Sequence, residues 1–482
     1  MNNQIKKKLI EICGIENVND GQEVLEKYSK DQSLVDPIKP LLVVFPENTD
    51  QVQDIIKLAN QNNISIIPIS SPNKYRFHGD TVPKSDNTII MNLSKMNKIL
   101  RIDKKNRVIM VEPGVTFGEL IDVAGKNGLR LLNPLFPRKS KSVLSSALER
   151  EPPIVPRFQW DSSDPLLCTE VIFGTGDYFR TGIAAGPGTI EEQIESGQAQ
   201  KNPMGPTQFS PYRLIQGAQG CFGVVTWATI KCEYLYDTEK LMFSQSDNFE
   251  DFFDFMRYLI KYRTADEVFI VNKVNLAALL GTDISNLSNL KDWILITNFT
   301  GMGQFGEDRI SYILADINDV INDYNIKLTE TLGNIDNSKI FEIIHETCEE
   351  SWRLKYKGGF QDIFYLTTLD NTVLHYNLVS KMTDLELGVY IQPINQGCGV
   401  HCEFDLYYNP ADTNEGSIKK SFLEISKKLM DIGAFFNRPY GLWADEMYAR
   451  VSNETISALR RVKEIFDPNN IMNRGALCFK EE

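Results

Sequence analysis

The sequence predicts an α+β fold with two lobes, and three observations support this prediction. The chain has 482 residues, whereas a typical domain has roughly 150, so a single small binding module is excluded. A strand–helix–strand pattern begins near Pro40. A second run of alternating strands and helices begins near Glu239. Together these features indicate a first α/β lobe and a later, smaller α+β layer that covers a site.

The first lobe begins with an apolar strand over residues 41–45. Thr49 can cap the following helix, because apolar residues then recur on one helical face. A second strand covers residues 64–70. In such a β-α-β unit a ligand phosphate is expected in the loop after a strand, here residues 68–82.

Thr116 and Glu119 form a T-x-x-E capping box, which predicts a helix that ends near Lys126. The strands predicted around this helix close the first lobe near Leu235, and two of them form a pair around the turn at 174–177. These strands cover residues 88–93, 108–113, 168–173, 177–182 and 223–235.

The second lobe alternates strands and helices, and it is followed by a final helix that stops at Asp467-Pro468. The strands are predicted at residues 241–246, 267–272, 293–299, 388–394 and 401–408. The helices are predicted at residues 251–262, 309–323, 416–431 and 455–466.

Composition and charge narrow the class of protein. Hydrophobic residues make up 42% of the chain, which is enough for a substantial core. The 51 Lys and Arg against 64 Asp and Glu give a net charge of −13, which disfavours nucleic acid as a partner. The eight cysteines are scattered, as is usual in a reducing compartment. The start of the chain is too polar for a signal peptide, and no run approaches the roughly 20 apolar residues of a membrane span. We therefore expect a cytoplasmic protein.

The segment 217–226 places Gly217, Gly220 and Gly223 three residues apart just before a strand. Such spacing lets a backbone approach a flat or phosphorylated ligand closely. A glycine-rich bulge in a sheet would give the same pattern, so this segment alone leaves both interpretations open.

Several motifs in chain order together resemble the FAD-linked oxidase superfamily. These motifs are the β-α-β start and residues 112–116, 146–151, 170–182, 212–228 and 466–473. The nearer branch is that of vanillyl-alcohol oxidase and 4-cresol dehydrogenase, and the glycolate oxidase and D-lactate dehydrogenase flavoproteins are more distant. The resemblance implies a PCMH-type FAD-binding lobe of two subdomains with an α+β cap domain over the flavin. The implied division is an N-terminal helical segment (1–37), an FAD-binding domain (38–236), a cap (237–436) and a C-terminal segment that returns to the FAD lobe (437–482).

By this resemblance the 68–82 loop would hold the FAD pyrophosphate through backbone N–H groups. The family usually has several glycines there, whereas this loop has only Gly79, with bulky Tyr75, Arg76 and Phe77 beside it. Arg76 could supply charge in place of the missing glycine turn. The cofactor-binding residues implied by the resemblance are Ile69, Ser70, Ser71, Arg76, His78, Gly79, Pro113, Gly114, Ser145, Ser146, Glu149, Gly217, Gly220, Gly223, Val225, His401 and Asn473.

Two residues are implied in catalysis. Counting back from Glu170, Asp161 falls where the nearer branch has an acidic residue beside the reactive flavin nitrogen, and it could accept a proton there. The alternative is that Asp161 or Asp164 caps a turn. In 435–448, Arg438 matches an arginine that faces the flavin and the substrate anion. A surface ion pair is the alternative for Arg438.

His401 and His78 have several possible roles. By the resemblance either could attach or contact the flavin, and each could also be an ordinary packed or loop residue. A metal cluster with Cys398, Cys402 and Glu403 is disfavoured, because strand alternation sends Cys402 to the face opposite His401 and Glu403. Nearby polar and aromatic residues could shape a substrate pocket, namely Tyr390, Gln392, Tyr440 and Trp443.

The resemblance implies an FAD-dependent oxidoreductase that takes a hydride from an alcohol-type or alkylphenol-type small molecule. One alternative is a 2-hydroxy-acid dehydrogenase of the glycolate oxidase type. Another is a flavin-free, non-catalytic subunit of a redox complex. The electron acceptor could be a separate redox subunit, because no C-x-x-C clusters for iron–sulfur centres are present. We expect a homo-oligomer, without a nucleic-acid partner or a membrane span.

Overall fold

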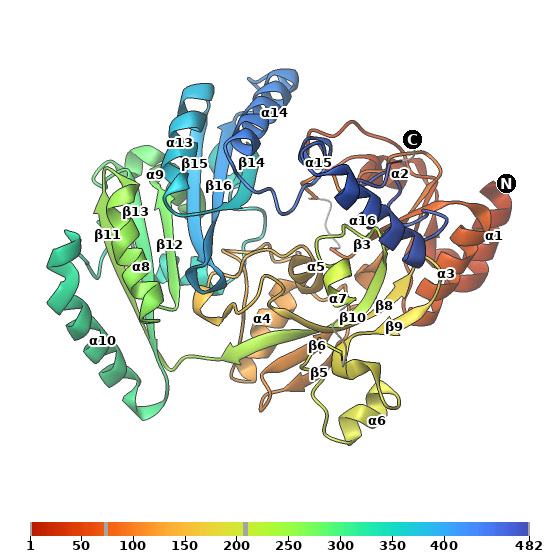
Figure 1. The fold of residues 1–482 in the computed structure, drawn as a ribbon, viewed down its shortest axis with the longest axis horizontal. Coiled ribbons are helices and arrows are strands. Elements are labelled where there is room, and N and C mark those ends of the chain that lie inside the picture. Colours follow the sequence, from red (N-terminus) through yellow and green to blue (C-terminus); the bar gives the residue numbers. More distant parts are fainter. Residues whose placement is uncertain (1, 72–75, 206–210, 481–482) are drawn as a thin grey trace.

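The computed structural model describes residues 2–71, 76–205 and 211–480, and these residues form three β-sheets. Two sheets and their helices make the first lobe, and the third sheet makes the cap beside it (Figure 1). The α+β class and the arrangement of lobe and cap that the sequence predicts are confirmed.

The first sheet has four strands in the order β1-β2-β4-β3, and both β2 and β3 run parallel to β4. The crossover between β2 and β3 is α3, whose first residue is Thr49. Its cap is Asn48 rather than Thr49, because the Asn48 side chain accepts a 3.0 Å hydrogen bond from the Gln51 N–H. The elements around this sheet are α1 (Asn2–Cys13), β1 (Val18–Asn19), α2 (Gln22–Ser29), β2 (Leu42–Val44), α3 (Thr49–Asn62), β3 (Ser65–Ile69) and β4 (Thr88–Asn92).

The second sheet is built around β10, which pairs with β6, β7 and β8. The predicted capping box is confirmed, since the Glu119 carboxylate accepts from the Thr116 N–H at 3.0 Å and α4 begins at the next residue. The predicted pair around the turn at 174–177 is β8 and β9. The elements are β5 (Ile99–Asp103), β6 (Val108–Val111), α4 (Phe117–Lys126), β7 (Leu129–Leu131), α5 (Val143–Leu148), β8 (Leu166–Phe173), β9 (Tyr178–Arg180), α6 (Ile190–Glu195), α7 (Tyr212–Ile215) and β10 (Gly223–Tyr234).

The third sheet is antiparallel, with its strands in the order β11-β13-β12-β15-β16-β14. The predicted domain boundary at 236 and 237 falls between the end of β10 and the start of β11. The strands are β11 (Thr238–Ser246), β12 (Glu267–Asn272), β13 (Trp293–Gly301), β14 (Gly359–Thr367), β15 (Glu386–Ile394) and β16 (Gly399–Tyr408). The helices are α8 (Phe253–Lys261), α9 (Lys273–Leu280), α10 (Gly306–Val320), α11 (Asn337–His345), α12 (Leu354–Lys357), α13 (Asn371–Met382) and α14 (Glu415–Asp431).

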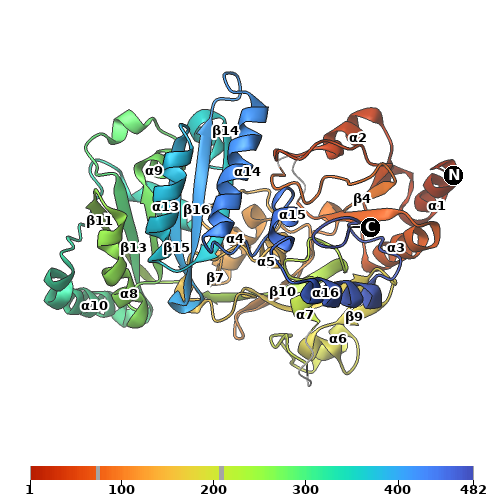
Figure 2. The same ribbon diagram turned by 45° about the horizontal axis from the view of Figure 1, so that its top comes forward.

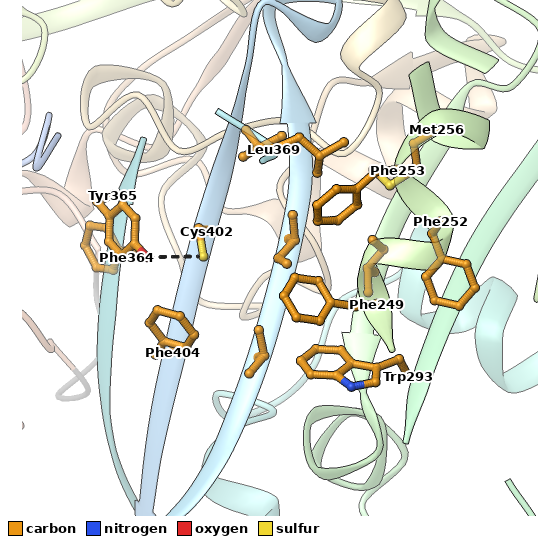
Figure 3. Close-up of a cluster of buried hydrophobic side chains, with 14 of the residues drawn as sticks. Phe249, Phe252, Phe253, Met256, Trp293, Phe364, Tyr365, Leu369, Cys402 and Phe404 are labelled. Atoms are coloured by element: carbon orange, nitrogen blue, oxygen red, sulfur yellow. Dashed lines mark hydrogen bonds between the residues drawn. The ribbon is translucent and has the colours of Figure 1, made fainter. Parts of the chain in front are cut away.

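The two faces of the cap sheet have different cores. On one face, α8, α10, α13 and α14 pack over an aromatic cluster that includes Phe249, Trp293, Tyr365 and Phe404 (Figure 3). On the other face, α9 and α11 cover only part of the sheet. Alternate residues of β14 and β16 on this second face remain available to line a cavity.

The C-terminal segment packs against the first lobe. Helices α15 (Trp443–Tyr448) and α16 (Asn453–Phe466) lie beside the first-lobe elements in both views (Figures 1 and 2). After α16 the chain runs alongside β3, where the Ile66 N–H donates to the Ile471 carbonyl at 2.7 Å. The Asn473 N–H donates to the Ile66 carbonyl at 2.8 Å. The last segment is therefore hydrogen-bonded to β3 of the first sheet.

Candidate active site

A cavity of about 260 Å³ lies where the two lobes meet. Its lining comes from the loop after β3, from the segment around α5, from the glycine segment before β10, from β14 to β16 of the cap, and from the segment after α14. We call the side formed by Gly217, Gly220 and Gly223 the glycine wall. We call the side formed by Asp362, Phe364, His401 and Glu403 of the cap strands the cap wall.

At the glycine wall the backbone itself faces the cavity. Gly217 and Gly220 have φ angles of +68° and +72°, a region that favours glycine. A Cβ atom added at Gly220 would lie 2.5 Å from Cγ of Pro68. The Asn473 amide fixes the turn between them, because it donates to the Gln219 carbonyl at 2.6 Å. The wall is therefore a fixed backbone surface without side chains, which suits a long, flat ligand.

Most of the residues expected to bind a cofactor line this cavity. They are Ile69, Ser70, Ser71, Arg76, His78, Pro113, Ser145, Glu149, Gly217, Gly220, Gly223, Val225 and His401. Gly79, Gly114, Ser146 and Asn473 lie behind the lining and support it. For example, the Gly114 N–H donates to the Met96 carbonyl at 2.7 Å, and the Ser146 hydroxyl donates to Glu151 at 2.6 Å.

Arg76 has a different role from the expected one. One guanidinium nitrogen donates to the hydroxyl and carbonyl of Thr81, and the other donates to the carbonyls of Lys27 and Lys30. The guanidinium also lies over the Tyr28 ring. Its donors are thus used to hold the glycine-poor loop in place, which corrects the idea that Arg76 supplies charge to a ligand phosphate. Residues 72–75, including Tyr75, lie outside the described residues.

A buried ionic cluster lines the cavity beside α5. The Lys141 ammonium lies 2.7 Å from the Glu149 carboxylate and 2.9 Å from the Glu151 carboxylate. Burial raises the pKa of Glu149. Although burial also opposes the ionisation of Glu151, Lys141 and Arg438 lower its pKa to about 2. Glu151 is therefore a fixed negative charge at neutral pH.

Four polar side chains surround the Phe364 ring of the cap wall. The Arg438 guanidinium lies 4.1 Å from the centre of this ring. The ring centroids of His78, Tyr440 and His401 lie 5.2, 6.1 and 6.2 Å from it. Phe364 thus brings together four polar side chains from three separate parts of the sequence. Because Phe364 is apolar, these polar groups meet in a partly desolvated place.

Arg438 lies on the cavity, as expected, and its side chain is buried, with only 5% exposed. Among the residues that the structure describes, none forms an ion pair with it, and its Nε has no hydrogen-bond partner. Glu151 acts on Arg438 electrostatically but not as a direct ion-pair partner, and a buried guanidinium without a direct partner is costly. The alternative of a surface ion pair is therefore excluded, and Arg438 fits the anionic part of a ligand.

His401 and Glu403 form a buried pair on β16. The His401 Nε2 lies 3.1 Å from the Glu403 carboxylate. Glu403 and Asp405 in turn share Arg353, whose Nε donates to both carboxylates at 2.7 and 2.9 Å. Burial lowers the pKa of His401. The Glu403 carboxylate opposes this shift without overcoming it, and Arg438 and Arg353 make smaller contributions that lower the pKa. His401 is therefore neutral at neutral pH.

The alternation that the sequence predicts for β16 is confirmed. Cys402 points to the opposite face from His401 and accepts a hydrogen bond from the Tyr365 hydroxyl inside the aromatic core of the cap (Figure 3). Tyr390 and Tyr440 line the main cavity. Trp443 lines a smaller neighbouring cavity, and Gln392 is buried against the Pro153 carbonyl.

Asp161 is not among the described residues that line the cavity. Its carboxylate lies 2.5 Å from the Arg213 guanidinium, and 39% of its side chain is exposed. It also accepts the Ser163 N–H at 2.9 Å, so it closes a turn. The turn-capping alternative holds, and the expectation that Asp161 lies beside the reactive ring is corrected.

Sequence reasoning missed several cavity residues, among them Asp362 and Phe364. Both lie on β14, which was not identified as a strand. Its sequence GFQDIFYLT has a short apolar run at 363–366 instead of a clear alternation. Arg353 was missed as well, because the partners that it holds, Glu403 and Asp405, come some 50 positions later in the chain.

Two family models match the chain. Residues 40–145 match an FAD binding domain, and residues 442–477 match the C-terminal domain of FAD linked oxidases. No helix in the described ranges has both the length and the apolar run needed to cross a bilayer.

Among curated proteins, the chain is 22% identical to the glycolate oxidase subunit GlcD of Bacillus subtilis, over 99% of this chain and 97% of that protein. It is 30% identical to the 4-cresol dehydrogenase [hydroxylating] flavoprotein subunit of Pseudomonas putida, over 40% of this chain and 37% of that one. A D-lactate dehydrogenase of Anaerostipes hadrus is 22% identical, over 95% and 94%.

Among solved structures, p-cresol methylhydroxylase with substrate bound superposes with a TM-score of 0.82 and 18% identity, over 99% of this chain and 97% of that one. The 4-ethylphenol oxidase from Gulosibacter chungangensis gives a TM-score of 0.81 and 18% identity, over 100% and 97%. At this level of identity the structures establish the fold.

Proposed function

Because this chain belongs to the FAD-linked oxidoreductases, we propose that it oxidises a small hydroxyl-bearing organic molecule whose anionic group binds Arg438. The favoured substrate class is an alcohol or alkylphenol. The observation that carries this proposal is the buried Arg438 guanidinium, which forms no direct ion pair with the described residues and lies over Phe364. A phenolate or carboxylate would form the direct ion pair that Arg438 lacks, and the aromatic ring would support the apolar part of the substrate.

The cavity fits FAD. At the glycine wall, added Cβ atoms would collide with neighbouring atoms, so only glycine leaves the backbone open to a ligand. In addition, Arg438 Nε and His401 Nδ1 are buried polar atoms without a partner in the described part of the chain. The residues that would hold the cofactor are the cavity-lining residues given above other than Arg76, whose guanidinium holds the loop instead. FAD, when bound, supplies the two-electron acceptor for the substrate hydride.

The protein contributes position and charge. Arg438 holds the substrate anion, Phe364 and Tyr440 exclude water, and the cap closes over the reacting groups. The ionised Glu151 carboxylate, which pairs directly with Lys141, offsets only part of the charge of Arg438.

The test is the anaerobic reduction of the FAD-loaded protein by 4-cresol and by 4-ethylphenol, followed as loss of visible flavin absorbance. Arg438→Met is expected to lower kcat/KM by about 10²–10³-fold, because it removes the charge that orients the substrate. Arg438→Lys should retain part of the rate. Arg213→Ala, which removes an arginine paired with Asp161 outside the cavity, is the matched control. An unchanged kcat/KM in Arg438→Met would contradict the proposal.

A second candidate is a 2-hydroxy-acid dehydrogenase. It is supported by similarity along nearly the whole chain to a glycolate oxidase subunit and a D-lactate dehydrogenase. A carboxylate is also the ideal bidentate partner of a guanidinium. Reduction of the FAD-loaded protein by glycolate or D-lactate, but not by alkylphenols, would favour this candidate.

We also propose an electron acceptor, a cellular location and an oligomeric state for this protein. A separate redox subunit is proposed as the electron acceptor, since one relative is named as the flavoprotein subunit of 4-cresol dehydrogenase. A cytoplasmic location and a homo-oligomer are also proposed. Light scattering on the purified protein tests the oligomer, and co-purification from the native host tests the partner.

A further inference from the structure

His78 and Asp362 meet across the boundary between the two lobes. His78 lies in the loop after β3, and Asp362 lies on β14 of the cap. The His78 Nε2 is 3.3 Å from the Asp362 carboxylate. The His78 ring is stacked on Tyr440 at 4.8 Å and meets the edge of Phe364 at 5.2 Å. The ring is therefore held on three sides, in a place that lines the main cavity.

The hydrogen bond to Asp362 decides which nitrogen of His78 can accept a proton. A carboxylate is only an acceptor, so Nε2 must carry the hydrogen when this bond forms. In the neutral ring Nδ1 is then the acceptor. Within the described ranges, no residue makes a hydrogen bond to Nδ1. This nitrogen is thus available to a ligand in the cavity.

The charges around His78 favour protonation. Burial opposes the positive charge, but the Asp362 carboxylate outweighs it and raises the pKa of His78, and Glu149 and Asp80 act in the same direction. These three acids come from three different elements, namely β14, the end of α5 and the loop of His78 itself. Tyr440, which stacks on the ring, stays protonated because burial raises its pKa well above the usual value.

We propose that His78 accepts the proton that the substrate hydroxyl releases, with Asp362 orienting the ring. This inference rests on the proposed function. Oxidation of a CH–OH group to C=O removes a hydride, with two electrons, and a proton. FAD, when bound, would accept the hydride, and the proton would pass from the hydroxyl oxygen to His78 Nδ1 and then to solvent. For an alkylphenol, the same nitrogen takes the phenol proton.

The other candidates for a proton acceptor fit this role less well. Asp161 lies outside the cavity lining, paired with Arg213. His401 faces two guanidinium groups, and the carboxylate beside it already binds Arg353. His401 is therefore suited to contact a neutral or negative atom, whereas His78 is suited to become a cation next to Asp362.

The first experiment uses the fact that the chain has four histidines. In protein labelled with ¹⁵N-histidine, each imidazole is followed by NMR as a function of pH, in the FAD-loaded and FAD-free forms. His78→Gln identifies the His78 signal, and Asp362→Asn should move its midpoint to lower pH. His345→Gln, which removes a histidine paired with Glu239 elsewhere in the cap, is the control. A His78 midpoint that does not respond to Asp362→Asn would overturn the orienting role.

The second experiment measures the rate of anaerobic FAD reduction by 4-cresol or D-lactate between pH 5 and 9. A base must be deprotonated, so the rate should rise with pH through the His78 midpoint. Asp362→Asn lowers that midpoint, so the acidic limb should move to lower pH. His78→Gln should lower kcat by about 10²–10⁴-fold with a much smaller change in KM. A rate that falls as His78 loses its proton would instead assign His78 to anion binding and overturn the proposal.

The two proposals fail in different ways. If His78→Gln reduces its FAD at the wild-type rate, or if acid precipitation shows that FAD is attached through His78, the base assignment is wrong while the oxidoreductase function stands. If the FAD-loaded wild type is reduced by neither alkylphenols nor 2-hydroxy acids, the proposed function fails, and the role of His78 in it fails with it.

Discussion

The glycine wall meets a ligand with backbone atoms, whereas the cap wall meets it with ionisable side chains. Gly217, Gly220 and the Asn473 bond to Gln219 keep the glycine wall free of side chains and fixed in shape. At the cap wall, Arg353 balances two carboxylates, and two histidines lie near carboxylates. The glycine wall should therefore be sensitive to added volume, and the cap wall to removed charge and to pH.

The two histidines of the cavity have similar contacts, but their pKa values are shifted in opposite directions. Both lie within about 3.3 Å of a carboxylate oxygen and contact Phe364. Yet the pKa of His78 is raised and that of His401 is lowered. Burial opposes the charge of both rings, but Asp362, Glu149 and Asp80 overcome it at His78. At His401 the single carboxylate of Glu403 does not overcome it, and Arg438 and Arg353 add to the effect of burial. Such divergence between paired groups is typical of sites with assigned acid and base roles.

The largest expected effect is at Arg353. Arg353→Met would leave Glu403 and Asp405 buried and without their cation. Breaking a buried ion pair from one side typically costs about 3–5 kcal/mol in the free energy of unfolding. Urea unfolding of the FAD-loaded protein measures this loss. Arg353→Met combined with Glu403→Gln and Asp405→Asn should recover part of the stability. If the Arg353→Met variant alone is as stable as the wild type, the cap wall does not depend on the ion pairs of Arg353.

A smaller effect is expected at the glycine wall. Gly220→Ala places a Cβ atom 2.5 Å from Cγ of Pro68 at a residue with a φ of +72°, so it should destabilise the protein by about 1–3 kcal/mol and weaken FAD retention. Gly125→Ala in α4 is the matched control, because nothing lies within 4 Å of its added Cβ. Retained flavin after gel filtration is the measurement. Equal retention in both variants would contradict the steric argument.

The smallest effect is expected outside both walls. Asp161→Asn breaks an exposed ion pair with Arg213, and exposed pairs contribute about 0–1 kcal/mol. The anaerobic reduction rate should stay within about twofold of the wild type. A loss of kcat comparable to that of His78→Gln would restore Asp161 as a candidate proton acceptor and would weaken the contrast between the two walls.

The turn and strand elements around the glycine wall could be predicted from sequence because their signals are local, although the role of the glycines themselves was left open. The glycine spacing, the capping box at Thr116 and the strand β10 each lie within one short window. The cap wall could not be predicted in the same way, because His78, Asp362, His401 and Arg438 meet only through tertiary structure. Asp161 was misassigned because counting along the chain from Glu170 cannot show that a turn at Ser163 points the carboxylate to Arg213.

The hydrogen bonds between the chain's last segment and β3 can form only late in synthesis, because that segment is made last. The Ile66 N–H pairs with Ile471, and Asn473 holds both the Gln219 and Asp80 carbonyls. A ribosome must therefore complete the whole cap before the first lobe receives the residues that close it. Until then the first lobe of the nascent chain lacks the hydrogen bonds of residues 471 and 473. A chain that ends before Asp467 would therefore lack the hydrogen bonds that hold the Asp80 and Gln219 carbonyls.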